Sequence, residues 1–249
     1  MVIRPAGKWH ADRPGPFGPP PGWWRRRLVT VAIAVYIVLL GWLTFAAAGS
    51  GTLRWDVPAQ RILRRLDGGG WDAVASFGNW LGVTWVGLVI LAVVAVPLLL
   101  QRHSAEAALL VGVELVRILN WPLKWLVDSP RPFTTDHQTN DVASGLGYPS
   151  GHAMGTMLIG GALVIVVFRL KQSPVARAGA VLVTTAAILA TGFGRVAIRA
   201  HWPSDVVGGW LWGLLLLGTV VLIVGALDRH WPRERTGPSP SSTTDPVVR

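Results

Sequence analysis

Six long apolar segments, separated by short polar stretches, dominate the pattern of hydrophobic and polar positions in this chain. They cover approximately residues 28–48, 80–100, 105–123, 153–170, 176–193 and 205–227. Each is close to the roughly 20 residues that an α-helix needs to cross the hydrocarbon core of a bilayer. The pattern therefore predicts an all-α, polytopic membrane protein with six transmembrane helices.

The two ends of the chain depart from this pattern. Residues 1–27 are rich in Pro, Gly and Arg, and residues 228–249 contain the run Gly-Pro-Ser-Pro-Ser-Ser-Thr-Thr. Segments of this composition bury too little apolar surface to fold. We therefore predict a membrane domain over residues 28–227, between two disordered tails.

Two segments near the N-terminus allow more than one interpretation. Three arginines precede segment 28–48 and three alanines end it, as in a signal peptide with its cleavage site. Its apolar stretch of about 21 residues exceeds the 7–15 typical of signal peptides, so an uncleaved helix is favoured over cleavage. The connection 49–79 alternates Arg with Leu or Ile, which predicts a short amphipathic helix, either on the membrane surface or in solvent.

Composition agrees with a membrane protein, and the charges set its orientation. Hydrophobic residues make up 51% of the chain and charged residues 14%, and there is no cysteine to form disulfides or thiolate metal sites. The net charge of +10 does not indicate nucleic-acid binding, because the basic residues lie in short loops and tails. Most of the 23 Lys and Arg residues lie in the tails and in the loops on the same side. The positive-inside rule therefore places both termini in the cytoplasm.

Three short polar motifs lie at the ends of apolar segments, all on the predicted extracytoplasmic side. They are Lys124-x6-Arg131-Pro132, Pro149-Ser150-Gly151-His152 and Arg195-x5-His201-x3-Asp205. Together they supply cations, a hydroxyl, imidazoles and a carboxylate. Such a set suits phosphoryl transfer, in which cations neutralise the phosphate oxygens, one His attacks and another protonates the leaving oxygen.

Each candidate residue has a chemical reason. Lys124 offers a point charge, and Arg131 offers a bidentate fork for phosphate oxygens. Ser150 is a good N-cap for the helix that follows, and the starts of helices bind anions. His201 lies in a short turn, and Asp205 falls in the first turn of the last helix, close enough to accept a hydrogen bond from it. That bond would fix the tautomer of His201 and leave its other nitrogen free to attack phosphorus.

The order and spacing of the motifs resemble the type 2 phosphatidic acid phosphatase superfamily, which includes membrane lipid phosphatases and vanadium haloperoxidases. The resemblance covers roughly residues 80–227. It implies that His201 is the nucleophile, that Asp205 orients it and that His152 protonates the leaving group. It also implies a phosphate-binding set: Lys124, Arg131, Ser150, Gly151 and Arg195. The family usually has Ser immediately before the last Arg, where this chain has Gly194.

The resemblance further implies metal-independent chemistry without a cofactor, and no histidine cluster in the sequence has metal-ligand spacing. One more polar group stands apart from the motifs. Glu114, Arg117, Asn120 and Lys124 share one face of a helix, within about 120° of arc. They form either a polar support beneath the phosphate site or, for the first two, an ion pair that satisfies only itself.

The sequence thus predicts an integral membrane protein, of a bacterial plasma membrane, that hydrolyses a lipid phosphate through a phospho-histidine. Phosphatidate, phosphatidylglycerol phosphate and polyprenyl pyrophosphate are the candidate lipids. The first alternative is a phosphotransferase that passes the phospho group to an alcohol at the same site. Six membrane spans argue against a haloperoxidase, and the complete set of His152, His201 and Asp205 argues against a non-catalytic lipid-binding or transport protein. The expected partners are the lipid and the bilayer, and the oligomeric state stays open.

Overall fold

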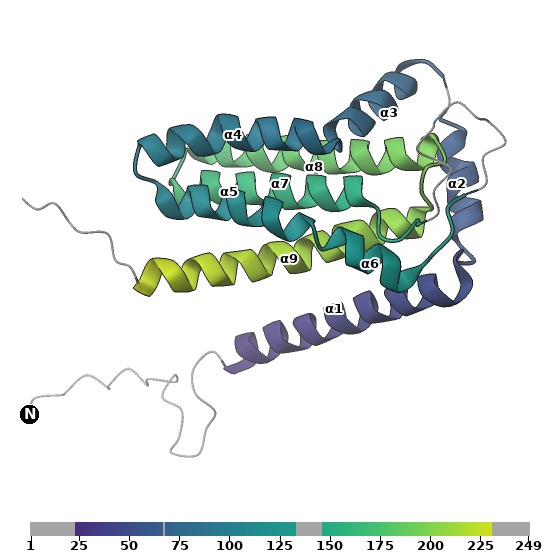
Figure 1. Cartoon of the computed structure of the whole chain (residues 1–249), viewed down its shortest axis with the longest axis horizontal. Coiled ribbons are helices and arrows are strands. Elements are labelled where there is room, and N and C mark those ends of the chain that lie inside the picture. Colours follow the sequence, from purple (N-terminus) through teal and green to yellow (C-terminus); the bar gives the residue numbers. More distant parts are fainter. Residues whose placement is uncertain (1–22, 67, 133–145, 231–249) are drawn as a thin grey trace, which may run out of the picture.

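The computed structural model describes residues 23–66, 68–132 and 146–230, and the regular secondary structure of these residues is helical. Figure 1 shows the helices in chain order. They are α1 (Trp23–Ser50), α2 (Asp56–Arg64), α3 (Gly70–Leu81), α4 (Thr84–Leu100), α5 (Ser104–Arg117), α6 (Asn120–Val127), α7 (Gly151–Arg169), α8 (Pro174–Ala197) and α9 (Pro203–His230).

Helix α7 lies at the centre of the bundle and contacts α4, α5, α8 and α9 (Figure 1). The largest group of buried apolar side chains gathers around it and includes Leu109, Leu110, Met154 and Leu158, all with no exposed surface. Lipid tails are as apolar as these side chains, so close packing, more than removal from water, holds helices together in a membrane. The packing of α7 against its neighbours therefore fixes where its first turn lies.

Four described helices are long and apolar enough to cross a membrane: α1, α7, α8 and α9. Helices α3 and α4 together would make a fifth span, but they meet at a bend of 68°. The prediction of an all-helical membrane protein is confirmed. The number of six spans is not, because the second and third predicted segments are each broken into two helices.

The breaks have local causes. Pro122 has no N–H to bond the carbonyl of Ile118, and its ring crowds that carbonyl, so α5 ends before it and α6 begins anew. The bend between α3 and α4 falls at Gly82, where a Cβ atom would lie 2.5 Å from the His152 ring. A side chain at this position would displace His152.

The predicted boundaries shift at both ends of the membrane domain. Residues 23–27 belong to α1 and residues 228–230 to α9, although the sequence pattern placed them in disordered tails. In the sequence, Pro21 precedes the start of α1 and Pro232 follows the end of α9. No proline lies within residues 23–27 or 228–230, so these residues are compatible with helix. The other tail residues lie outside the described part of the chain.

Helix α1 is tied to the rest of the fold by polar contacts. The Tyr36 hydroxyl donates to the carbonyl of Leu211, and Ser129 Oγ donates to Gly51 O at 3.3 Å. Thr44 Oγ1 lies 2.8 Å from the hydroxyl of Tyr148, which is fully buried just before the second motif. These contacts favour an uncleaved α1 that belongs to the folded domain over a signal peptide that is removed. The short helix predicted within 49–79 is present as α2, and its place relative to the membrane surface stays a prediction.

Candidate active site

Most of the predicted site residues line one cavity of about 990 Å³ at the end of the bundle where α7 and α9 begin (Figure 1). Six of the eight take part: Lys124, Arg131, Gly151, His152, Arg195 and His201. Helix α1 begins and α9 ends at the opposite end of the bundle. The three motifs, far apart in sequence, therefore meet in space, while Ser150 and Asp205 are fully buried and lie outside this lining.

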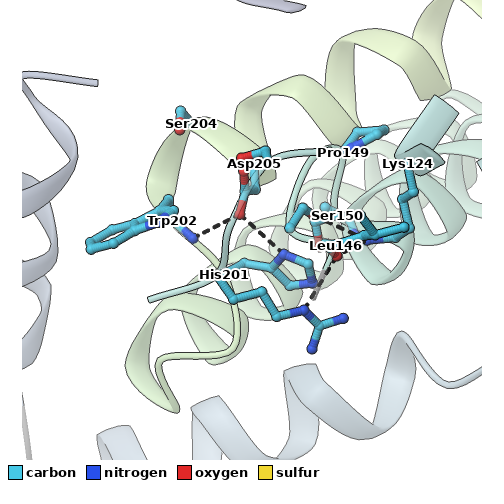
Figure 2. A network of polar contacts seen from close by, with 12 residues as sticks. Lys124, Leu146, Pro149, Ser150, His201, Trp202, Ser204 and Asp205 are labelled. Carbon is cyan, nitrogen blue, oxygen red and sulfur yellow. Dashed lines mark hydrogen bonds and ion pairs between the residues drawn. The ribbon is translucent and has the colours of Figure 1, made fainter. Parts of the chain in front are cut away.

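Figure 2 shows how Asp205 holds His201. Asp205 lies in the first turn of α9, and its Oδ2 is 3.3 Å from His201 Nδ1 and accepts a hydrogen bond from the Trp202 N–H at 3.0 Å. Since Nδ1 faces the carboxylate, Nε2 is the nitrogen available for attack. Burial, followed by the charges of Arg195 and Lys124, holds the pKa of His201 well below its usual range. This lowered pKa favours the neutral imidazole of His201 at physiological pH.

The second motif forms the turn into α7. Ser150 Oγ accepts a hydrogen bond from the Ala153 N–H at 3.5 Å, so the N-cap predicted from the sequence is confirmed. The Ser150 N–H donates to the Asp205 carbonyl at 2.9 Å, which joins the second motif to the third. Because the Ser150 hydroxyl is buried behind the cavity wall, its direct contact with phosphate stays a prediction. His152, two residues later, faces the cavity.

The first motif is fastened to the backbone just before the second. Lys124 Nζ donates to the carbonyls of Leu146, at 2.8 Å, and Gly147, at 3.1 Å (Figure 2). Arg131 Nε donates to the same Leu146 carbonyl at 3.3 Å. Burial and the charge of Arg131 lower the pKa of Lys124 to about 8. Two cations therefore converge on one short stretch of backbone at the rim of the cavity.

Arg195, the third cation, is held by a residue that the sequence did not single out. Its Nη1 donates to Oδ1 of Asn79 on α3 at 2.5 Å. Helix α3 reaches this position because α8 has glycine at the contact. A Cβ at Gly194 would overlap the carbonyl oxygen of Ala75, and Gly78 lies equally close to the α8 backbone at Ala190.

Asp56 on α2 is a second residue that sequence reasoning missed. Its fully buried carboxylate accepts hydrogen bonds from the Ser204 N–H and hydroxyl, both at 2.8 Å, and from the Leu53 N–H at 2.7 Å. It thereby caps the start of α9, one residue before Asp205. Within the described residues, no group of three or more His, Asp or Glu side chains is placed to hold a metal ion.

The sequence of the chain matches the PAP2 superfamily over residues 105–229, half of its length. The chain belongs to the PAP2 superfamily. The resemblance inferred from the three motifs is thus confirmed, and all eight predicted site residues lie in the part of the chain that the match covers.

Two known proteins are similar to the chain. The fold resembles the crystal structure of a transmembrane PAP2-type phosphatidylglycerolphosphate phosphatase from Bacillus subtilis, with a TM-score of 0.64 and 21% identity, over 81% of this chain and 98% of that one. Glucose-6-phosphatase catalytic subunit 1 of Bos taurus is 31% identical over 150 residues. The match covers 47% of this chain and 40% of the bovine protein, so the chain matches less than half of that relative.

Restoring the usual PAP2 residue at position 194 should damage the site. We expect Gly194→Ser to force α3 away from α8, to break the Asn79–Arg195 bond and to lower the free energy of unfolding by about 1–3 kcal/mol. Thermal unfolding in detergent and kcat/KM for phosphate release measure the two effects. Gly179→Ser is the matched control, because Gly179 lies on the same helix with no atom near its Cβ position. Wild-type stability and activity in Gly194→Ser would contradict this account.

Activity should fall as pH rises through about 8. Burial lowers the pKa of Lys124 to about 8, so its ammonium group loses its charge in this range. The loss belongs to the free enzyme and should appear in kcat/KM. In Lys124→Arg the charge persists to much higher pH, so the alkaline decline should move upward by more than about one pH unit, at lower overall activity. Lys171→Arg, at the exposed opposite end, serves as control. An unmoved alkaline decline in Lys124→Arg would rule out Lys124 as its cause.

Proposed function

We propose that the protein is a metal-independent membrane phosphatase that removes phosphate from a lipid through a phospho-histidine. The observation that carries this proposal is the buried His201–Asp205 pair, which opens onto a cavity shared with His152 and three cations. Membership of the PAP2 superfamily supports it. The phosphatidylglycerolphosphate phosphatase of Bacillus subtilis, with a similar fold, is a precedent for a lipid phosphate as substrate.

In the first chemical step, His201 Nε2 attacks phosphorus. The P–N bond forms as the bond from phosphorus to the lipid oxygen breaks, and His152 gives its proton to that oxygen, so that a neutral alcohol leaves. A monoanionic phosphate ester can bring this proton into the cavity. Lys124, Arg131 and Arg195 neutralise the phosphate oxygens, on which charge accumulates in the transition state.

In the second step, water attacks phosphorus from the side that the alcohol has left. The P–N bond breaks, inorganic phosphate forms, and His152 accepts the proton of the water. Asp205 stabilises the positive charge that His201 carries while it is phosphorylated. His152 passes this proton to the departing phosphate, which leaves as the monoanion, so both histidines return to their neutral starting states.

The wall of the cavity supports a lipid as the substrate. Ile118, Trp121 and Trp125 line the cavity, yet each exposes about two thirds of its surface, at 70%, 65% and 69%. In a helix bundle that crosses a bilayer, exposed apolar side chains of this kind face lipid. An acyl chain could therefore remain in the bilayer while its phosphate enters the cavity between the helices.

We also propose that the cavity opens on the extracytoplasmic side of a bacterial plasma membrane, with both termini in the cytoplasm, as the distribution of Lys and Arg indicates. The chain has no cysteine, so single-cysteine variants can be labelled cleanly. In intact cells, an impermeant thiol reagent should label Gly70→Cys, at the cavity end of the bundle, and not Gln172→Cys, at the other end. Labelling of Gln172→Cys alone would invert the orientation.

The function itself is tested by phosphate release from purified protein in detergent, with phosphatidate, a phosphatidylglycerol phosphate and a polyprenyl pyrophosphate as substrates and with excess chelator. We expect release of inorganic phosphate from at least one of them at an undiminished rate with chelator present. An added acceptor alcohol distinguishes hydrolysis from transfer, because a transferase would give the phosphorylated alcohol in place of inorganic phosphate. Activity lost on chelation and restored by magnesium would overturn the metal-independent mechanism.

A further inference from the structure

The catalytic cavity contains a second polar cluster that the proposed reaction does not use. Thr84, at the start of α4, and Glu114 and Arg117, on α5, line the same cavity as the histidines. Arg117 Nη1 lies 3.5 Å from Glu114 Oε1, and Nη2 donates to Thr84 Oγ1 and to the carbonyl of Gly82, each at 3.1 Å. The polar helix face predicted from the sequence is therefore part of the cavity wall.

The cluster lies on the His152 side of the cavity. The Arg117 guanidinium packs against Gly155, one turn after His152 on α7, where a Cβ would be 2.8 Å from the guanidinium carbon. Gly82, whose carbonyl accepts from Arg117, lies against the His152 ring itself. In phosphoryl transfer the leaving oxygen is opposite the attacking atom. With His201 as nucleophile and His152 as acid, this cluster borders the place of the leaving group.

The hydrogen bonding of the cluster is incomplete. Glu114 Oε2 is buried and accepts no hydrogen bond from any residue that the structure describes. A buried carboxylate oxygen without a donor is costly, so a ligand that brings an O–H group would be favoured there. The Glu114 carboxylate also offsets the charge of Arg117. The cluster is thus close to neutral and has an acceptor to offer, which suits a hydroxyl better than a second phosphate group.

We propose that Thr84, Glu114 and Arg117 form a leaving-group subsite that selects phosphate esters of a polyol. Glu114 lines the cavity, and a turn of its side chain brings Oε2 to the cavity surface, where a further hydroxyl of the leaving alcohol donates to it. Arg117 donates to a neighbouring oxygen. The proposal rests on the proposed function and narrows its substrate class. A phosphorylated glycerol headgroup on a lipid and a free sugar phosphate share this chemistry, whereas phosphatidate leaves as a diacylglycerol whose other hydroxyls are esterified.

The test compares kcat/KM for a lipid with a phosphorylated glycerol headgroup with kcat/KM for phosphatidate, in the same micelles. This ratio does not depend on the fraction of protein that is folded. We expect Glu114→Gln to lower the ratio about tenfold or more, because a hydrogen bond to a carboxylate is lost for one substrate only. A sugar phosphate is the third substrate, and its kcat/KM relative to phosphatidate should fall as well. The polyol ester with the higher kcat/KM in wild type then identifies the source of the polyol. A polyprenyl pyrophosphate is the fourth, and its kcat/KM should not fall.

Glu106→Gln is the matched control. Glu106 lies on the same helix and also pairs with an arginine, Arg169, at 3.1 Å, but outside the cavity. Its loss should lower stability and leave the ratio unchanged. A ratio in Glu114→Gln within about twofold of wild type, or a fall shared by phosphatidate, would overturn the subsite, since hydroxyl recognition by a charged group predicts a larger difference. A wild-type protein that releases phosphate from none of the four substrates would instead reject the proposed function.

Discussion

Replacing His201 by alanine should abolish phosphate release, with a loss of at least about 10³-fold, because the reaction then lacks its nucleophile. The fold should survive, since among the described residues the ring's side-chain hydrogen bond is with Asp205, and the helices on either side of it are held by other contacts. The measurement is the rate of phosphate release from purified, monodisperse protein. A second readout is the phospho-enzyme, which should be trapped by an alkaline quench in wild type and be absent in His201→Ala.

His103→Ala is the control for this experiment. His103 precedes α5 at the opposite end of the bundle and lies 3.8 Å from Glu106, so its loss removes an imidazole without touching the cavity. It should retain normal turnover. A well-folded His201→Ala protein that still releases phosphate at a near-normal rate would remove His201 from the role of nucleophile.

Asp205→Asn should lower kcat by about 10³–10⁴-fold, in line with the loss of the carboxylate that orients a catalytic histidine. The amide can still accept the Trp202 N–H, so the start of α9 should persist. It no longer offsets the charge of a phosphorylated imidazole, and it allows the wrong tautomer of His201. The measurement is single-turnover formation of the phospho-enzyme, which should slow as much as kcat.

Asp56→Asn is a demanding control for Asp205→Asn. Both aspartates are fully buried near the start of α9, but Asp56 binds Ser204 and Leu53, not His201. Its replacement should reduce thermal stability and affect kcat far less than Asp205→Asn does. Equal losses of kcat in the two variants would mean that Asp205 acts by supporting the fold and not by orienting His201.

Much of the candidate site could be predicted because its parts are local. Each motif is short and lies where an apolar segment ends, so helices that pack side by side bring these ends together. The bond between His201 and Asp205 follows from their spacing of four residues across the start of α9, and the cap at Ser150 follows from the residue type. These predictions required no knowledge of how the helices pack.

The features that could not be predicted depend on contacts between distant segments. Asn79 is an ordinary polar residue in sequence and becomes the partner of Arg195 only because α3 packs closely on α8. Asp56 likewise meets Ser204 across a large separation in the chain. Pro122 could have predicted the break before α6, but the long apolar segment 105–123 favoured one continuous helix. The bend at Gly82 had no signal in the hydrophobic pattern, and the close approach of the His152 ring to Gly82 depends on how α7 packs.

The close contact between α3 and α8 limits how this protein can exchange parts with its relatives. Gly194 makes room for α3, and Asn79 on α3 then holds Arg195, so this hydrogen bond depends on the close contact that Gly194 allows. A chimera that took α8 from a relative with serine at this position, and kept the present α3, would combine two surfaces that do not fit. We therefore expect a chimera to keep its activity only when α3 and α8 come from the same protein.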